Sequence, residues 1–370
     1  MKTQLSSLDI HFLLKELQVL IGGKVDTVYH PAKKELLLLF HVPRSGKFML
    51  RLVAGKALFL TSSKEDQSAP SSFCMFLRKH IGNSKLVNLH QMEAERIVCF
   101  EFDTKAGKEK LYVEFFAKGN FVFCDASDTI LVAEEYVAFK DRSIKSKLTY
   151  AYPHLGANLF LAREKELAAL FKGSSRDSLV KSLAVELGLG GPFAEEVCLL
   201  ASIEKTQKPF ELEKKEILSL HRVLVGLLHT PISARIVFDG SPLDVVPFAL
   251  TSYSSLRFEG YDSFNLAFDH YFTHLTVEKK SPSEKKKDSL LRLLEQQSEH
   301  IRELESEVAE NTSKAELIYA HYTLLDSVLK ELKEITKKHS WKEISDKLKN
   351  HKLVKEVDGK EKRVIVEVGD

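Results

Sequence analysis

Cysteine is scarce and scattered in this sequence, and no stretch is long and apolar enough to suggest a membrane span. The four cysteines, Cys74, Cys99, Cys124 and Cys198, include no C-x-x-C pair. A disulfide framework and a zinc knuckle are therefore both disfavoured, and a reducing compartment fits best. No run approaches the length of about 18 apolar residues typical of a span. Because the N-terminus opens an amphipathic helix instead of an apolar signal core, we expect a cytoplasmic protein with no membrane partner.

The sequence also lacks the motifs of common enzymes. A search for a nucleophile elbow, a Walker loop, a dinucleotide fingerprint, a zinc-ligand cluster and a carboxylate pair with a nearby base finds none. We therefore expect no enzyme, no catalytic residue, no bound metal and no cofactor, although a site assembled from distant residues would escape such a search. Formal net charge is only +2, so any affinity for nucleic acid must come from local basic patches.

With 370 residues the chain is long enough for two or three domains, and its patterns predict an α+β fold. Ser6 or Ser7 should cap a first helix that ends at Gly22-Gly23. Short strands separated by turns then indicate antiparallel sheets that pack on each other. One helix, residues 72–81, interrupts these strands, which we expect at residues 25–29, 35–41, 47–52, 57–61, 96–103, 110–116, 120–125 and 130–133.

A three-glycine hairpin near the middle of the chain stands between two predicted helices. Gly188 supplies a residue free to take positive φ, and Pro192 suits the first turn of the next helix. Because helix N-termini carry unpaired amides, the backbone at Gly188, Gly190 and Gly191 is a candidate contact for a nucleic-acid phosphate. A purely structural pair of helices is the alternative. A dinucleotide-binding loop fits poorly, since no strand precedes these glycines and the full G-x-G-x-x-G spacing is absent.

Two other polar features have competing interpretations. Asp9 lies in the first turn of the first helix, where a carboxylate complements the helix dipole. Glu95 and Arg96 precede a strand, where neighbouring acid and base residues most often form a surface ion pair of little energetic value. The alternative is a rigidly mounted polar pair that binds a ligand.

The last third of the chain predicts a few strands at residues 232–238, 242–246 and 254–259, then an amphipathic helix over residues 262–272. A lysine-rich hinge follows at 279–288. Apolar residues from Leu290 to Leu332 alternate at spacings of four and three, which indicates a coiled-coil helix roughly 60 Å long. Gln297 and Asn311 in its seam would set register. A short helix at 341–348 and a hairpin about Asp358-Gly359 should end the chain.

Six segments together resemble the NFACT proteins, a family that includes eukaryotic nuclear export mediator factor and bacterial proteins once named for fibronectin binding. They occur in order over about residues 5–275: Ser7–Leu17, Ile21–Val25, Glu95–Ile97, Lys118–Asp125, Gly188–Cys198 and Phe264–Phe272. The resemblance implies an NFACT-N domain at 1–150, β-sandwich-like and similar to the N-terminal domain of formamidopyrimidine-DNA glycosylases. It further implies a helix-hairpin-helix domain with a small appendage at 151–278, a coiled-coil helix at 279–340 and a coiled-coil tip at 341–370. The family's C-terminal RNA-binding domain is expected to lie beyond the end of the sequence.

In function, the resemblance implies ribosome-associated quality control. The partners would be the large ribosomal subunit, its rRNA, and tRNA, including the peptidyl-tRNA that obstructs the subunit. The protein would recruit aminoacyl-tRNA, and ribosomal RNA would extend the stalled peptide without a message. The unpaired coiled-coil helix also offers a surface through which two copies of the chain could form a homodimer.

Two residues match the family's tRNA-recruiting positions, namely Asp9 and the arginine Arg96 of its Asp-Arg pair. Here the pair is Glu95-Arg96, which keeps the charge with one extra methylene. An arginine held by a carboxylate can bind phosphate or stack on a base. The competing hypothesis is a DNA-binding or DNA-repair protein of glycosylase-like fold, against which Lys2 stands where such glycosylases expose a proline. A surface adhesin is disfavoured by the absence of an export signal.

Overall fold

The computed structural model describes residues 1–63, 70–139, 142–153, 158–161, 163–275, 282–336, 341, 344, 354–358 and 363–366. The chain forms two compact units, Met1–Lys280 and Ser281–Asp370. Among these residues, no helix combines the length and the apolar character needed to cross a membrane. The finer domain boundaries expected at residues 150 and 340 stay predictions.

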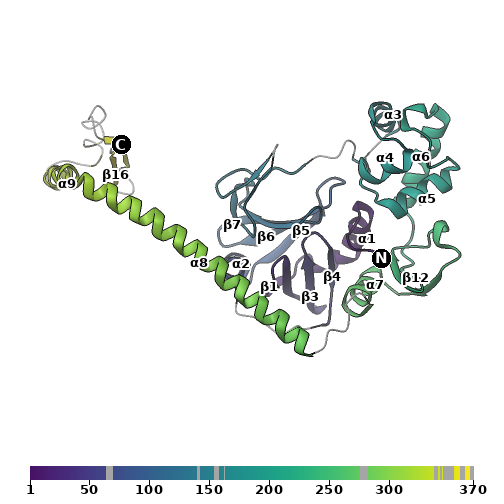
Figure 1. Ribbon diagram of the computed structural model, residues 1–370, viewed down its shortest axis with the longest axis horizontal. Helices are drawn as coiled ribbons and strands as arrows, with labels where there is room; N and C mark the ends of the chain where they lie inside the picture. Colours follow the sequence, from purple (N-terminus) through teal and green to yellow (C-terminus); the bar gives the residue numbers. More distant parts are fainter. Residues whose placement is uncertain are drawn as a thin grey trace. The chain divides into compact units, whose positions relative to one another are not determined.

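A nine-stranded antiparallel sheet forms the centre of the first unit. Its hydrogen-bonding order is β4-β3-β2-β1-β5-β6-β7-β8-β9. The expected antiparallel pairing is confirmed, whereas the separate sheets that were expected are joined into one. The two halves meet between β1 and β5 through one register pair, Lys24 with Lys85, and Figure 1 shows them as two groups of arrows. The strands are β1 (Lys24–Ala32), β2 (Glu35–Val42), β3 (Gly46–Val53), β4 (Ala57–Leu60), β5 (Lys85–Gln91), β6 (Ile97–Thr104), β7 (Gly107–Glu114), β8 (Asn120–Cys124) and β9 (Ile130–Ala133).

Two apolar clusters cover the faces of this sheet. The larger contains the inward residues of both halves, among them Leu38, Phe40 and Phe100, together with the buried faces of the helices. The smaller includes Cys99 and Tyr112 on the opposite face of β6 and β7. Two short strands follow, β10 (Val137–Ala138) and β11 (Ser143–Ile144). Ile144 of β11 and Tyr150 also belong to the smaller cluster.

The two helices of the sheet region follow the sequence prediction closely. Helix α1 (Ser7–Leu17) begins at the N-cap Ser6, continues into the 3-10 turn η1 (Gln18–Leu20) and buries an apolar stripe. Helix α2 spans Ser72–Ile81, the range predicted, and the Oγ of its N-cap Ser71 accepts a hydrogen bond from the Cys74 amide. Side-chain caps of this kind satisfy amides that the first helical turn leaves unpaired.

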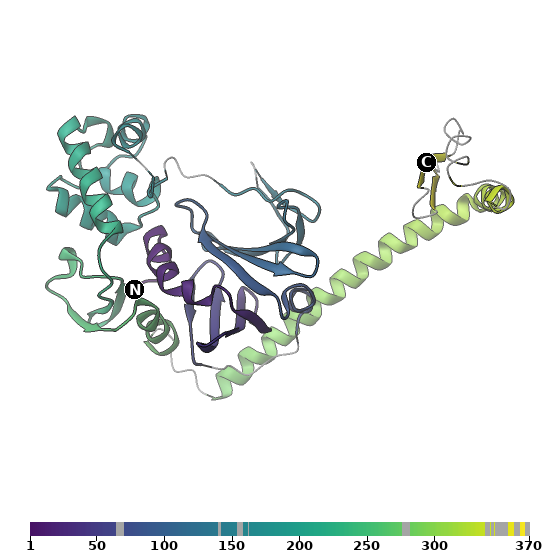
Figure 2. The same cartoon turned by 180° about the vertical axis from the view of Figure 1, so that it is seen from behind.

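A helical region and a small sheet complete the first unit. The helices are α3 (Glu164–Gly173), α4 (Leu179–Val185), α5 (Gly191–Ala201) and α6 (Lys214–Leu228), with the 3-10 turn η2 (Pro209–Glu211). The small sheet contains β12 (Arg235–Asp239), β13 (Ser241–Val246) and β14 (Arg257–Gly260), close to the three strands predicted, with the turn η3 (Thr251–Tyr253) between the last two. Helix α7 (Phe264–His270) runs into the π-helical turn η4 (Tyr271–Leu275). In both views the N-terminus lies beside α7 and this small sheet (Figures 1 and 2).

The second unit differs from its prediction in two places. Helix α8 (Pro282–Ala320) begins inside the expected lysine hinge, because Pro282 is compatible with a first helical position. The expected single long helix is interrupted at His321, after which α9 spans Tyr322–Thr336. Strands β15 (Val354–Asp358) and β16 (Arg363–Val366) form the predicted antiparallel hairpin. Most of the short helix expected at 341–348 lies outside the described residues.

Two glycines allow one close approach within the sheet region. Gly119 has φ +68°, and the backbone of Ala54 and Gly55 passes so near that a Cβ at position 119 would overlap it. Gly55 is held there by a hydrogen bond of 3.0 Å from its amide to the Glu114 carbonyl oxygen. This contact fastens the turn before β8 to the turn after β3.

We expect Gly119→Ala to destabilise the chain more than a glycine substitution with matched backbone geometry. Gly240 has φ +66° with open space around its Cα, so Gly240→Ala should cost only the left-handed penalty of about 1–2 kcal/mol. Gly119→Ala should add an overpacking penalty of about 1–3 kcal/mol. Urea unfolding of both variants measures the difference, and equal losses would contradict the proposed backbone contact.

Candidate functional site

The N-terminal segment, residues 2–6, joins elements that are far apart in the sequence. The Lys2 amide donates hydrogen bonds to the Leu243 carbonyl oxygen at 2.8 Å and to the Tyr271 hydroxyl oxygen at 2.9 Å. The Leu5 amide donates to the Lys56 carbonyl oxygen at 3.0 Å. The segment is therefore fixed to β13, to η4 and to the turn between β3 and β4.

Asp9 is completely buried at the start of α1, with an exposed fraction of 0%. Its Oδ2 accepts hydrogen bonds from the Ser6 amide and the Ser6 hydroxyl, both at 2.8 Å. The Asp9 amide in turn donates to the Ser6 Oγ at 3.1 Å, which completes a capping box. The Oδ1 of Asp9 accepts a hydrogen bond from the Lys2 Nζ at 2.9 Å. In this arrangement neither carboxylate oxygen faces solvent, so Asp9 has no surface to offer an RNA base or ribose.

Lys2 connects two buried carboxylates. Its Nζ lies 2.9 Å from Asp9 and 3.1 Å from Asp244, and it also donates to the Val245 carbonyl oxygen at 2.8 Å. Burial alone would lower the pKa of Lys2, but Asp244 and Asp9 together raise it above its usual value. Burial raises the pKa of Asp9, and Lys2 opposes that rise. The result is a charged lysine shared by two carboxyl groups in the protein interior.

The Glu95-Arg96 pair lies in the turn between β5 and β6. Glu95 is buried, with 6% exposed, whereas Arg96 is half-buried. The Nη1 of Arg96 donates to the Gln4 Oε1 at 3.2 Å and to the Leu5 carbonyl oxygen at 3.5 Å. Burial lowers the pKa of Arg96, and the neighbouring Glu95 carboxylate opposes this effect. Arg96 is therefore a half-buried cation that contacts both the N-terminal segment and solvent.

Gln91 links this turn to the first helix. Its Nε2 donates to the Ser7 Oγ at 3.0 Å, to the Ser7 carbonyl oxygen at 3.2 Å and to the Glu95 carbonyl oxygen at 2.8 Å. One side chain therefore sets the position of the Glu95-Arg96 turn relative to the start of α1.

The glycine hairpin contacts the same start of α1. The Gly188 carbonyl oxygen accepts a hydrogen bond of 3.1 Å from the Ser7 amide, and a Cβ at Gly190 would lie 3.2 Å from the Ser6 Cβ. Gly188 and Gly190 have φ values of +69° and +76°. The amides of Leu189 and Gly190 donate to carbonyl oxygens of α4, so these two are already occupied. The hairpin braces the N-terminal segment, and its contact with a phosphate stays a prediction.

Asp9, the Glu95-Arg96 pair and the glycine hairpin therefore all contact the segment of residues 2–9. The sequence did not reveal Lys2, Gln91 or Asp244, which hold them together. A signal existed for Asp244 alone, because a carboxylate within the otherwise apolar run of β13 calls for a buried partner. We refer to Lys2, Asp9 and Asp244 as the N-terminal ion cluster.

A second polar chain has the order of a serine-histidine-acid triad. The His30 Nδ1 lies 2.6 Å from the Ser71 Oγ, and the His30 Nε2 lies 3.0 Å from the Glu134 Oε1. However, the Ser71 Oγ caps α2, and the Glu134 Oε1 also accepts a hydrogen bond of 2.7 Å from the Lys34 amide. We interpret this chain as an anchor of α2 on the sheet.

Groups able to bind a metal gather elsewhere. His90, Cys99 and Glu101 place their ligand atoms within 4.8 Å of one another on β5 and β6. These residues belong neither to the N-terminal ion cluster nor to the glycine hairpin.

Comparison with known proteins gives a consistent result over nearly the whole chain. The model of the NFACT N-terminal and middle domains matches residues 6–363. The chain is 30% identical over 372 residues to the archaeal Rqc2 homolog aRqcH of Methanocaldococcus jannaschii, covering 95% of this chain and 55% of that protein. It is 24% identical to the human ribosome quality control complex subunit NEMF, covering 93% of this chain and 35% of that protein. The chain thus spans about half, or less, of the length of these relatives.

The solved structures that resemble it include a fibrinogen-binding protein from Staphylococcus aureus, with a TM-score of 0.60 and 16% identity. That match covers 72% of this chain and 98% of the other. The N-terminal part of a fibronectin/fibrinogen-binding protein from Streptococcus suis gives a TM-score of 0.58 at 20% identity, with the same two coverages. These likenesses establish a shared mixed fold with a large antiparallel sheet.

We expect Lys2→Met to lower the free energy of unfolding by about 3–5 kcal/mol, since it leaves two buried carboxylates without their cation. Lys47→Met is the control, because the pair of Lys47 with Asp26 is exposed, at 64% and 40%, and should contribute less than about 1 kcal/mol.

The loss of unfolding free energy in Lys2→Met should depend on pH in a defined direction. Without Lys2, burial keeps the pKa of Asp9 above its unfolded value of about 3.9. The folded state then binds protons more tightly, so its stability is lost as pH rises through the folded pKa. The deficit of Lys2→Met should therefore be larger at neutral pH than in mild acid. Urea unfolding at the two pH values measures it, and a deficit that is equal at both would refute the proposed charge imbalance.

Proposed function

Because the chain belongs to the NFACT family, we propose that it acts in ribosome-associated quality control. It binds large ribosomal subunits obstructed by peptidyl-tRNA and recruits aminoacyl-tRNA for template-free tailing of the stalled peptide. The observation that carries this proposal is the match over 95% of the chain to a protein named as an Rqc2 homolog. Peptide-bond formation is left to ribosomal RNA, so the protein acts by binding and positioning.

Within this function, Arg96 is the residue we assign to direct RNA contact. Of the three residues proposed for tRNA recruitment, Asp9 and Glu95 are buried, and Arg96 alone is half-exposed. A guanidinium presents a planar fork that suits phosphate oxygens and the faces of splayed bases. Its position is fixed by Gln4 and by the Leu5 carbonyl oxygen.

Asp9 and Glu95 then act as positioning residues. Asp9 holds Lys2 and Ser6 and so shapes the segment that receives the Arg96 side chain. Glu95 contributes through its carbonyl oxygen, which binds Gln91, and through its charge beside Arg96. An arginine held in place before binding loses less conformational entropy when it contacts a phosphate.

The finer architecture is also a proposal. The α4–α5 pair with its glycine turn is the helix-hairpin-helix element, and Gly191 at the exposed first position of α5 is its candidate phosphate contact. Helix α8 is one strand of a coiled coil, since Leu294, Ile301 and Val308 of its seam are more than half exposed. A second helix, from the same protein or from a second copy, would cover this seam.

The DNA-repair alternative finds no support in the N-terminal geometry. The glycosylases in question use a proline at this position as their nucleophile, whereas this chain has Lys2, whose side-chain nitrogen contacts Asp9, Asp244 and the Val245 carbonyl oxygen. We expect no borohydride-trapped adduct with an abasic duplex.

We expect Arg96→Ala to weaken binding of tRNA-bearing large subunits by about 1–3 kcal/mol, or roughly 5- to 150-fold in Kd. Arg96→Lys keeps the positive charge but removes the planar guanidinium. Binding should be close to that of the unchanged chain if the contact is a simple ion pair with phosphate, and should stay weak if the contact is bidentate. Co-sedimentation with obstructed and with empty large subunits, at several salt concentrations, measures both variants.

Arg222→Ala removes an exposed arginine from α6 and serves as the control for general charge loss. Circular dichroism of each variant checks that the fold is kept. Unchanged binding of a folded Arg96→Ala variant, or an equal loss in Arg222→Ala, would reject the assignment of Arg96.

A further inference from the structure

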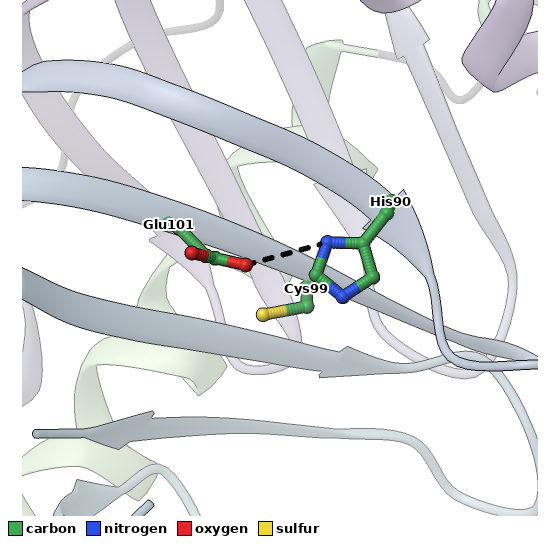
Figure 3. A group of neighbouring side chains, drawn as sticks. All are labelled: His90, Cys99 and Glu101. Carbon is green, nitrogen blue, oxygen red and sulfur yellow. Dashed lines mark ion pairs between the residues drawn. The ribbon is translucent and has the colours of Figure 1, made fainter. Parts of the chain in front are cut away.

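Three side chains on β5 and β6 converge on one point of the sheet surface. His90 lies opposite Cys99 in the register of the two strands, and Asn88 lies opposite Glu101. Residues two apart on a strand share a face, so Cys99 and Glu101 are on the same side. Figure 3 shows the Glu101 carboxylate facing the His90 ring, with the Cys99 side chain beside them.

The distances are close to those of a tetrahedral metal site. The His90 Nδ1 and the Glu101 Oε1 are 3.6 Å apart, and each residue offers a ligand atom within 4.8 Å of the others. Ligand bonds to Zn²⁺ of about 2.0–2.3 Å place neighbouring ligand atoms roughly 3.3–3.6 Å apart. The pair of His90 and Glu101 already meets this spacing, and the Cys99 sulfur lies within 4.8 Å of both ligand atoms.

Asn88 shows that His90 and Glu101 each present an acceptor atom to the same neighbouring group. Its Oδ1 accepts a hydrogen bond of 2.9 Å from the Leu89 amide, which fixes the orientation of the side-chain amide. The Nδ2 then lies 2.9 Å from the Glu101 Oε1 and 3.2 Å from the His90 Nδ1. An amide nitrogen only donates, so the His90 Nδ1 carries a lone pair, and both this nitrogen and the Glu101 Oε1 accept from the Asn88 amide, whose place a bound metal would take. This is the tautomer that a metal requires.

We propose that His90, Cys99 and Glu101 bind a divalent transition-metal ion of the zinc class, with water or an incoming ligand at the fourth position. An imidazole, a thiolate and a carboxylate suit zinc, whereas magnesium and calcium prefer oxygen ligands alone. His90 and Glu101 are partly exposed and Cys99 is buried beneath them, which leaves the open position on the solvent side. The nearest basic side chain, Lys110, is paired with Asp128 at 2.7 Å.

The site goes beyond the proposed function and does not depend on it, but its location connects the two. His90 precedes Gln91, and Cys99 follows Ile97 by two residues, so the metal would fasten the base of the turn that carries Glu95 and Arg96. The spacing of the three ligands in the sequence explains why the sequence analysis did not find them. They are separated by eight residues and then by one, which matches no zinc motif, and only the strand register brings them together.

Titration of the metal-free chain with Co²⁺ tests the proposal directly. We expect one equivalent to give thiolate-to-cobalt charge-transfer absorption and the intense visible bands of tetrahedral cobalt, and Zn²⁺ to displace both. Cys99→Ser should abolish the charge-transfer band, and His90→Ala and Glu101→Gln should each weaken binding by at least about tenfold.

Cys124→Ser is the matched control, because Cys124 is a free buried thiol of the same apolar cluster as Cys99 but is not among the three ligands. It should bind cobalt as the unchanged chain does. Absence of the charge-transfer band in the unchanged chain, or its loss in Cys124→Ser with retention in Cys99→Ser, overturns the site whatever the outcome of the ribosome-binding experiments.

Discussion

The N-terminal ion cluster is the constraint on which the proposed RNA site depends. A charged lysine is costly to bury without anionic partners, and two buried carboxylates are costly without a cation. Lys2 meets both requirements, and in doing so it fixes the first residues of the chain between α1, β13 and η4. The positions of Gln4, Leu5 and Ser6 follow from this attachment. The N-terminus is thereby a structural element of the first unit.

Around that fixed segment, the buried candidate residues differ in role from the half-exposed one. Asp9 uses both of its oxygens within the protein, and Gln91 bonds the start of α1 to the turn between β5 and β6. Arg96 is the half-exposed member of the group, and Gln4 accepts a hydrogen bond from its guanidinium. The glycine hairpin contributes a carbonyl oxygen and a close backbone approach, not a set of free amides. The proposed RNA contact and its structural support therefore involve different residues of one connected group.

The proposed metal group belongs to the β5–β6 hairpin and lies next to the turn that carries Glu95 and Arg96. The turn between β5 and β6 is bonded through Gln91 on one side, and His90 and Cys99 lie at its base. A metal at that base would restrict the turn without contacting the RNA. The pairing of β5 with β6 sets His90 opposite Cys99. The turn between the same two strands carries Arg96, which donates a hydrogen bond to Gln4 of the N-terminal segment.

The sequence by itself determined the local elements whose signals are local. The cap of α1, the bounds of α2, the strands β12 to β14 and the β15–β16 hairpin follow from caps, apolar periodicity and turn residues. Strand β5 was missed because Asn88, His90 and Gln91 break its apolar pattern. Tertiary structure alone decided that nine strands form one sheet, that Asp9 is buried against Lys2, and that His90 meets Cys99. Each of these depends on pairing between distant segments, and a local pattern contains no information about which distant segment will supply the partner.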